Sequence, residues 1–276
     1  MTRQLRITLG QCSDKGRKEI NQDFHGACVP KEPQLATKGI AIALADGVSS
    51  SAVSRVAAES AVNAFVEDYY CTSEAWSVRT SAERVLMATN SWLHAQTQAS
   101  PFRYDREKGY LCTFSGVVIK STTAHLFHVG DARICRLHGT ALEPLTEEHR
   151  VWVSAEQSYL ARAMGLDRKV ELDYRTLQLD AGDVLLLAID GVCEHWDGAF
   201  VAATIAEWRD DLDRAARLIV EEAYRRGSDD NLTLQIVRID SLPAPEANEM
   251  YRQLTELPCP PLLEARQHFE GFRIVR

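Results

Sequence analysis

Short apolar stretches, separated by Gly, Asp and Ser, predict that this chain is built largely from β-strands. Each stretch is rich in Val, Ile, Leu and Thr, and some alternate between apolar and polar residues. The predicted strands are residues 5–11, 39–45, 114–119, 123–129, 132–137, 174–179, 183–189 and 232–239. The three strands between residues 114 and 137 follow one another so closely that they predict a meander of antiparallel hairpins.

Three longer segments repeat their apolar residues at the spacing of an α-helix. The first covers residues 53–65, and the second begins with a predicted capping box formed by Thr80 and Glu83. The third begins near Asp210 or Asp211. Helices set among hairpin-linked strands favour an α+β layered domain over a regular βαβ repeat.

The composition of the chain changes near residue 240. Five of the nine prolines fall between Pro243 and Pro261. We therefore predict a folded domain over residues 1–240, followed by a proline-rich linker and the start of a further segment over residues 241–276.

The net charge and the cysteine pattern indicate which partners the protein lacks and in which compartment it works. The net charge is -8 and no basic cluster occurs, which argues against a nucleic-acid partner. No apolar run approaches the roughly 20 residues that cross a bilayer. The N-terminus also lacks the features of a secretory signal, so we predict no membrane partner. The seven cysteines form no CxxC pair, and we interpret them as reduced core residues of a cytoplasmic protein.

Aspartates at or beside the ends of predicted strands are the candidate chemical groups. Four of them are Asp46, Asp131, Asp190 and Asp230, and a fifth, Asp23, follows a turn. Taken singly, each is explained by the frequency of Asp in turns. If the strands are neighbours, however, the converging carboxylates would repel one another unless a cation lies among them. Oxygen ligands favour magnesium or manganese over zinc, so the pattern predicts a divalent-cation site if the strands meet.

Several short motifs follow one another in a specific order. They are SDKGRKEINQD (13–23), ALADGVSS (43–50), HVGDAR (128–133), LTEEH (145–149), ARAMG (161–165), GDVLLLAIDG (182–191) and SDDNLTL (228–234). This series resembles the bacterial form of the type 2C, metal-dependent serine/threonine protein phosphatases. The resemblance covers about residues 5–240.

The resemblance implies an α-β-β-α sandwich, in which two antiparallel sheets lie between layers of helices. It also implies two manganese or magnesium ions, with a weaker third, at the ends of the sheets. Carried over by motif, Asp46 would bridge the two ions, and the Gly47 carbonyl, Asp190 and Asp230 would be further ligands. Asp23 would bind directly or through water. Asp131 would hold the third ion together with Asp190. The implied reaction is hydrolysis of phosphoserine or phosphothreonine by a metal-activated water, with no protein nucleophile.

Departures from the family pattern leave the residue that contacts the substrate phosphate open. Relatives carry an arginine five residues before the Asp of the first motif, whereas this sequence has Lys18 there, preceded by Arg17. A guanidinium can bind phosphate through a bidentate fork, which favours Arg17, although Arg17 is also explained as a plain surface residue. Ser49 and Ser50 replace the usual glycine pair after Asp-Gly, and Gln22 stands where many eukaryotic members have Glu.

We assign no catalytic histidine. Val48 stands where eukaryotic members carry the candidate general acid. We interpret His128 as a strand residue and His149 as a loop residue that forms hydrogen bonds.

Two other functions stay open at this point. A regulatory or binding module on the same fold would be marked by loss of metal aspartates, and an unrelated metal-dependent hydrolase would prefer small phosphate esters. The predicted partners are phosphorylated proteins and a cognate or fused serine/threonine kinase, because the tail LEARQHFEGFRIVR resembles the lead-in to a protein kinase domain. Residues 150–168 match the variable flap beside the family's active site, which we expect to affect substrate choice.

Overall fold

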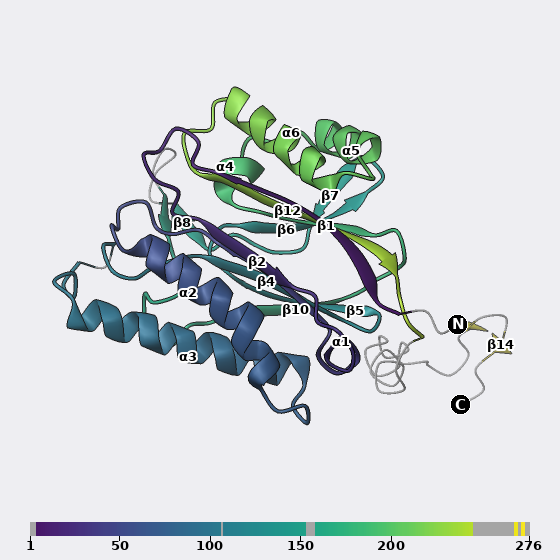
Figure 1. Ribbon diagram of the computed structural model, residues 1–276, viewed down its shortest axis with the longest axis horizontal. Coiled ribbons are helices and arrows are strands. Elements are labelled where there is room, and N and C mark those ends of the chain that lie inside the picture. The colour runs from purple at the N-terminus through teal and green to yellow at the C-terminus, as the bar shows by residue number, and fades with distance from the viewer. Residues whose placement is uncertain (1–3, 106, 153–157, 245–267, 270–271, 274–276) are drawn as a thin grey trace. The chain divides into compact units, whose positions relative to one another are not determined.

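Two antiparallel sheets of five strands each lie face to face in the computed structural model (Figure 1). The first sheet has the order β1-β12-β11-β6-β7 and consists of β1 (Arg6–Asp14), β12 (Leu232–Ser241), β11 (Val184–Ala188), β6 (Arg133–His138) and β7 (Ala141–Pro144). The second has the order β10-β5-β4-β3-β2 and consists of β10 (Asp173–Gln178), β5 (Thr123–Val129), β4 (Phe114–Lys120), β3 (Ile40–Ala45) and β2 (Phe24–Cys28).

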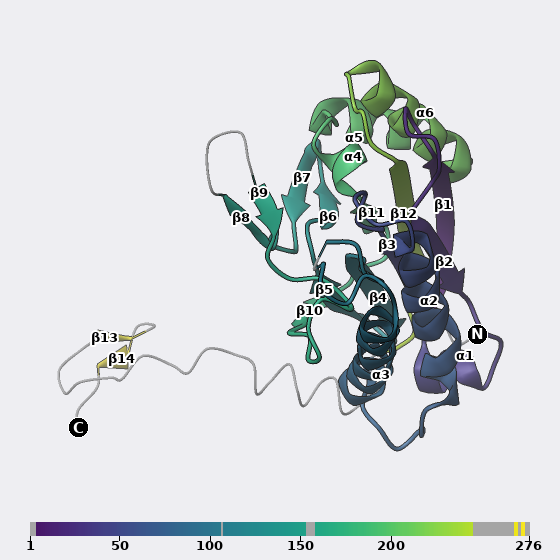
Figure 2. The same cartoon turned by 90° about the vertical axis from the view of Figure 1, so that its left-hand side faces the viewer.

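Helices cover the outer faces of both sheets, as Figures 1 and 2 show from two directions. On the first sheet lie α5 (Gly198–Glu207) and α6 (Leu212–Arg225), and on the second lie α2 (Ser54–Glu67) and α3 (Val78–Ala99). The shorter helices are α1 (Gln34–Lys38), η1 (Asp68–Cys71) and α4 (Asp190–Cys193). The predicted α+β class and its α-β-β-α sandwich are therefore confirmed.

The structure describes residues 4–105, 107–152, 158–244, 268–269 and 272–273. The chain divides into two compact units, Met1–Ala244 and Pro245–Arg276. In the second unit, β13 (His268–Phe269) pairs with β14 (Phe272–Arg273) as a short antiparallel hairpin. Most of the predicted linker and C-terminal segment, residues 241–276, lies outside the described residues. Within the described part of the chain, no helix has the length and apolar character that crossing a membrane requires.

Strand β3 shows how one strand contributes to two cores. Ile40, Ile42 and Leu44 are fully buried in a cluster that they share with residues of the first sheet. The alternate positions of β3 are all alanine and belong to a second cluster, with residues of α2 and α3. Successive side chains of a strand point to opposite faces, and the small methyl groups allow α2 to pack closely on the sheet. The continuous apolar run of β3 is thus explained by burial on both faces.

The predicted meander between residues 114 and 137 is wrong in its last strand. β4 and β5 pair as expected, but β6 pairs with β11 and β7 in the other sheet. The chain crosses between the sheets at Gly130, whose φ of 115° is rare for residues with a side chain. A carbon added to Gly130 would lie 2.4 Å from Cβ of Thr113, so packing also requires glycine there. This crossing places Asp131 between the two sheets.

The predicted helix starts have different outcomes. Helix α6 begins after Asp211, whose carboxylate accepts a hydrogen bond from the Arg214 amide at 3.0 Å, as expected. Helix α3 begins earlier than predicted, because Ser77 rather than Thr80 is the capping residue. Elements without a prediction are short or, like α5, apolar over most of their length, so they show little periodicity. They are β2, β7, α1, η1, α4, α5, the hairpin of β13 and β14, and the separate two-stranded sheet of β8 (Arg150–Trp152) and β9 (Ser158–Leu160).

We expect Gly130→Ala to lower the free energy of unfolding by roughly 2–4 kcal/mol, because it adds a strained φ and a close contact with Thr113. Gly182→Ala is the matched control, since Gly182 has a φ of 98° and open space around the added carbon. That control should lose only about 1–2 kcal/mol. Urea unfolding followed by circular dichroism measures both values. Equal losses would show that the contact with Thr113 contributes nothing.

Candidate metal centre

Strand ends from both sheets bring three of the predicted aspartates together. Asp46 follows β3 and Asp131 follows β5 in the second sheet, whereas Asp190 follows β11 in the first. One carboxylate oxygen from each of these residues lies within 4.8 Å of the others. Three carboxylates at this separation, between the ends of two sheets, form a candidate site for a hard cation.

Asp23 and Asp230 complete an electrostatically coupled group. In the first sheet, Asp14 at the end of β1 lies opposite Leu232 at the start of β12. The loop after β1, which carries Asp23, therefore starts beside the turn that carries Asp230. Burial raises the pKa of Asp46 well above its ordinary value, and the charges of the four other predicted aspartates raise it further. All five aspartates thus belong to one group.

Buried oxygens without partners show that this group suits a cation. Burial raises the pKa of Asp23 to about 7, although the Thr233 hydroxyl, which donates to Asp23 Oδ2 at 2.6 Å, opposes the shift. Burial also raises the pKa of Asp190 to about 8, and the charge of Asp131 adds to the effect. Among the described residues, the Oδ1 atoms of Asp23 and Asp131 are buried and accept no hydrogen bond. A divalent cation offsets these costs by binding ionised carboxylates, so the donor set fits magnesium or manganese.

Two glycines allow backbone segments to approach each other closely beside the carboxylates. A carbon added to Gly47 would lie 2.8 Å from the Gln22 carbonyl oxygen. One added to Gly191, which follows Asp190, would lie 2.1 Å from the Asn231 carbonyl oxygen. Gly47, the predicted main-chain ligand, is therefore buried against the segment that carries Gln22, and it forms a β-bridge with Cys112.

Neutral hydrogen bonds that were not predicted hold the loops around the aspartates. Gln22 Nε2 donates to the Ser51 carbonyl at 2.7 Å and to Ser54 Oγ at 2.6 Å. The Gln22 amide donates to Asn231 Oδ1 at 2.8 Å. Asn231 Nδ2 in turn donates to two carbonyls of the loop after β1, at 2.9 and 3.0 Å. Both residues stand directly beside predicted aspartates in the sequence, and this adjacency is the signal that could have identified them.

The two candidate phosphate-contacting residues have different neighbours. Arg17 Nη2 donates to the Tyr224 carbonyl at 3.2 Å, and its guanidinium carbon lies 4.3 Å from the centre of the Tyr224 ring. Lys18 Nζ lies 3.3 Å from Asp230 Oδ1. The structure thus places Lys18 beside the acidic group and Arg17 at the C-terminal end of α6.

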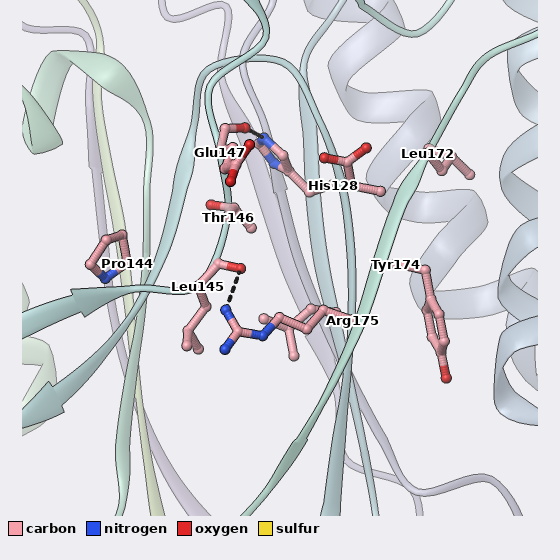
Figure 3. Close-up of a pocket in the computed structure, with 10 residues that line it drawn as sticks. His128, Pro144, Leu145, Thr146, Glu147, Leu172, Tyr174 and Arg175 are labelled. Carbon is pink, nitrogen blue, oxygen red and sulfur yellow. Dashed lines mark hydrogen bonds between the residues drawn. The ribbon is translucent and has the colours of Figure 1, made fainter. Parts of the chain in front are cut away.

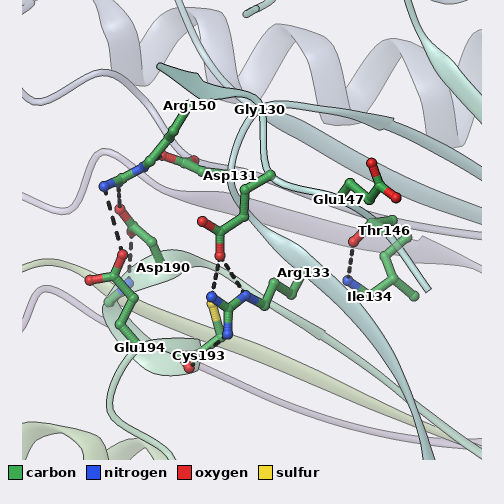
Figure 4. Close-up of polar contacts among 12 residues, drawn as sticks. Gly130, Asp131, Arg133, Ile134, Thr146, Glu147, Arg150, Asp190, Cys193 and Glu194 are labelled. Carbon is green, nitrogen blue, oxygen red and sulfur yellow. Dashed lines mark hydrogen bonds and ion pairs between the residues drawn. The ribbon is translucent and has the colours of Figure 1, made fainter. Parts of the chain in front are cut away.

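Arg150 lies at the acidic group although it was not predicted as a site residue. Its Nε donates to Asp131 Oδ2 and its Nη2 to Asp190 Oδ2, each at 2.7 Å (Figure 4). Its Nη1 lies 3.7 Å from Glu194 Oε1. In the sequence, Arg150 only ends a charged run and begins the predicted flap. That pattern does not indicate the direction of a long side chain.

The family model described as protein phosphatase 2C matches residues 13–231 of this chain. The chain belongs to the protein phosphatase 2C family. The match spans the five aspartates, so the family predicted from the ordered motifs is confirmed.

Relatives and solved structures support this assignment. The serine/threonine phosphatase stp of Listeria monocytogenes is 25% identical over 252 residues, which cover 83% of this chain and 94% of the relative. The fold matches the Streptococcus agalactiae serine/threonine phosphatase with a TM-score of 0.73, at 22% identity, over 85% of this chain and 100% of that chain. It matches the catalytic domain of the phosphatase PstP, in complex with two manganese ions, with a TM-score of 0.70, at 21% identity, over 86% and 99%. The predicted class of enzyme, a metal-dependent serine/threonine protein phosphatase, is confirmed by the family and these relatives.

The histidines near the motifs of this phosphatase form structural hydrogen bonds, as expected. His128 is buried in β5, and its ring is hydrogen-bonded to Ser115 Oγ at 2.8 Å. Figure 3 shows its second hydrogen bond, to the Glu147 carbonyl at 3.0 Å. Burial lowers the pKa of His128 to about 4, so its ring is neutral at pH 7. His149 Nε2 lies 2.9 Å from Asp173 Oδ2. The adjoining pocket of about 670 Å³, drawn in Figure 3, contains none of the five aspartates and is separate from the metal centre.

We expect the phosphatase in EDTA to lose thermal stability as the pH rises from about 4 to about 8. An unfolded carboxyl ionises near pH 4, whereas the pKa of Asp190 is about 8 in the folded chain. The folded state therefore holds more protons across this window, and its stability falls as they are lost. Thermal unfolding at several pH values measures the slope, which should be shallower for Asp190→Asn and should disappear in excess Mn²⁺. Equal slopes for the wild type and Asp190→Asn would contradict this account.

Proposed function

We propose that this phosphatase hydrolyses phosphoserine and phosphothreonine in protein substrates at the site formed by its five aspartates. The observation that carries the proposal is the approach of Asp46, Asp131 and Asp190 to within 4.8 Å at the ends of the two sheets. Asp131 is buried, Asp46 and Asp190 are half-buried, and the three carboxylates repel one another and suit divalent cations. The family membership supplies the reaction class.

The ligands in this proposal follow the motif assignment. Two manganese or magnesium ions would share Asp46, with Asp190, Asp230 and the Gly47 carbonyl as further ligands and Asp23 acting directly or through water. Asp131 would hold a third ion together with Asp190. When bound, the ions supply an activated water and offset the negative charge on the phosphoryl oxygens.

Lys18 is the residue that we propose to contact the substrate phosphate. Its ammonium lies 3.3 Å from Asp230, and its side chain is 34% exposed, so it can reach a phosphate arriving from solvent. Arg17 is already engaged with Tyr224 at the end of α6. This placement favours Lys18, although the bidentate geometry of a guanidinium favoured Arg17.

We extend the proposal to the organisation of the chain. Residues 1–240 form the phosphatase domain, and residues 241–276 form a proline-rich linker and the start of a further segment. The partners of this phosphatase are phosphorylated proteins in the cytoplasm and a cognate or fused serine/threonine kinase. The six cysteines in the described residues form no disulfide, although Cys71 is exposed rather than part of the core as predicted. These free cysteines and the kinase-like lead-in of the tail support this part of the proposal.

A regulatory or binding module is the alternative from another class. It would be expected to lack metal-binding aspartates, whereas all five predicted aspartates are present. We therefore favour the enzyme.

We expect Mn²⁺-dependent hydrolysis of a phosphothreonine peptide that is abolished by EDTA. Asp190→Asn should lower kcat/KM by roughly 100-fold or more, because it removes a charged ligand. Asp211→Asn is the matched control, since Asn caps a helix as well as Asp does and activity should stay within about twofold. Phosphate release measures all three proteins. A wild type without turnover at any metal concentration would favour the binding module, and a strong preference for small esters would favour a different hydrolase.

We expect Lys18→Ala to raise KM for the phosphopeptide about 10-fold, which corresponds to about 1.4 kcal/mol of lost binding. Arg17→Ala should leave KM nearly unchanged but lower the free energy of unfolding by about 1–2 kcal/mol, because it loses the contact with Tyr224. Steady-state kinetics and urea unfolding of both variants separate the two roles. A larger KM effect for Arg17→Ala would assign the phosphate contact to that residue instead.

A further inference from the structure

Arg150 supplies positive charge to two of the carboxylates that a cation would use. Its two 2.7 Å hydrogen bonds end on Oδ2 of Asp131 and Oδ2 of Asp190 (Figure 4). Together with Asp46, these two residues form the set whose ligand oxygens lie within 4.8 Å of one another. A guanidinium and a divalent cation cannot both occupy the space between one pair of carboxylates.

The electrostatic environment makes this pairing strong. The Arg150 side chain is 22% exposed, that of Asp131 is 8% exposed, and that of Asp190 is 16% exposed. Charge-assisted hydrogen bonds among such groups are stronger than those of fully solvated pairs. A cation entering at Asp131 and Asp190 would therefore have to break two strong contacts.

Arg150 begins a structural element that is not part of either five-stranded sheet. In the part of the chain that the structure describes, β8 pairs only with β9 and joins neither five-stranded sheet. The ladders that the structure describes for the two five-stranded sheets therefore do not include the backbone of Arg150.

We propose that Arg150 is a built-in counter-ion that competes with a divalent cation for the Asp131–Asp190 pair. In this phosphatase, the guanidinium weakens or replaces binding of the ion at that pair and leaves binding at Asp46 to the other ligands. The inference rests on the proposed metal-dependent function and goes beyond it, because it assigns to this chain a residue that limits how many ions are bound. Arg150 is therefore a positioning residue for Asp131 and Asp190.

Calorimetric titration with Mn²⁺ tests the competition without measuring activity. Arg150→Gln should bind one more Mn²⁺ per chain than the wild type, or bind its weakest ion at least about 10-fold more tightly. Arg150→Lys keeps the charge but loses the fork, so its gain should be smaller. Arg162→Gln is the matched control, because Arg162 belongs to the same flap segment but pairs with Asp173 at 2.9 Å, and its isotherm should equal that of the wild type.

A double-mutant cycle shows where the additional ion binds. Asp131→Asn should abolish the gain in the Arg150→Gln background while changing the wild-type isotherm little. If Arg150→Gln does not fold, as judged by circular dichroism, the titration of Arg150→Lys replaces it. The smaller gain in Mn²⁺ binding expected of that variant then tests the inference. Identical isotherms for the wild type and the Arg150 variants, with Mn²⁺ bound and turnover intact, would overturn this inference alone. Absence of Mn²⁺ binding in every variant would overturn the proposed metal-dependent function as well.

Discussion

Repulsion among carboxylates at the ends of the two sheets is the constraint that shapes the rest of this site. Burial and neighbouring charges raise the pKa of Asp46 well above its ordinary value, and they raise that of Asp190 to about 8. Protonation, a bound cation and a basic side chain are three ways to lower the cost of placing such groups together. The structure supplies basic side chains at two places, with Lys18 beside Asp230 and Arg150 between two other members of the group. Every other feature of the site has to be compatible with that distribution of charge.

The surrounding loops are held by groups that add no charge. The amide side chains of Gln22 and Asn231 bridge the loop after β1, the loop after β3 and the start of β12. An amide both donates and accepts hydrogen bonds while staying neutral, so it can order a loop without changing the repulsion among the aspartates. The close backbone approaches at Gly47 and Gly191 also hold the loops without adding charge, because no side chain lies between the segments there.

The serines that replace the family's usual glycine pair have a structural explanation. Ser50 Oγ donates to the Glu107 carbonyl at 2.8 Å, and Ser49 Oγ accepts a hydrogen bond from Lys18 Nζ at 3.4 Å. The Ser50 hydroxyl attaches the loop after Asp46 to the segment that leads into β4, and the Ser49 hydroxyl contacts the loop after β1. The departure from the family pattern therefore anchors the loop, and it leaves Asp46 at the end of β3 in contact with the rest of the acidic group.

Local patterns in the sequence were sufficient for most of the strands, for the start of α6 and for the candidate aspartates, because alternation, capping and turn composition involve residues close together in the chain. The order of the motifs was sufficient for the family. Contacts between distant segments were not predictable in the same way. They determine that β6 leaves the expected meander for the other sheet, that Lys18 rather than Arg17 lies against Asp230, and that Arg150 reaches Asp131 and Asp190. The physical reason is that the sheet a strand joins, and the direction in which a long basic side chain turns, depend on packing and charge contributed by residues far away in the sequence.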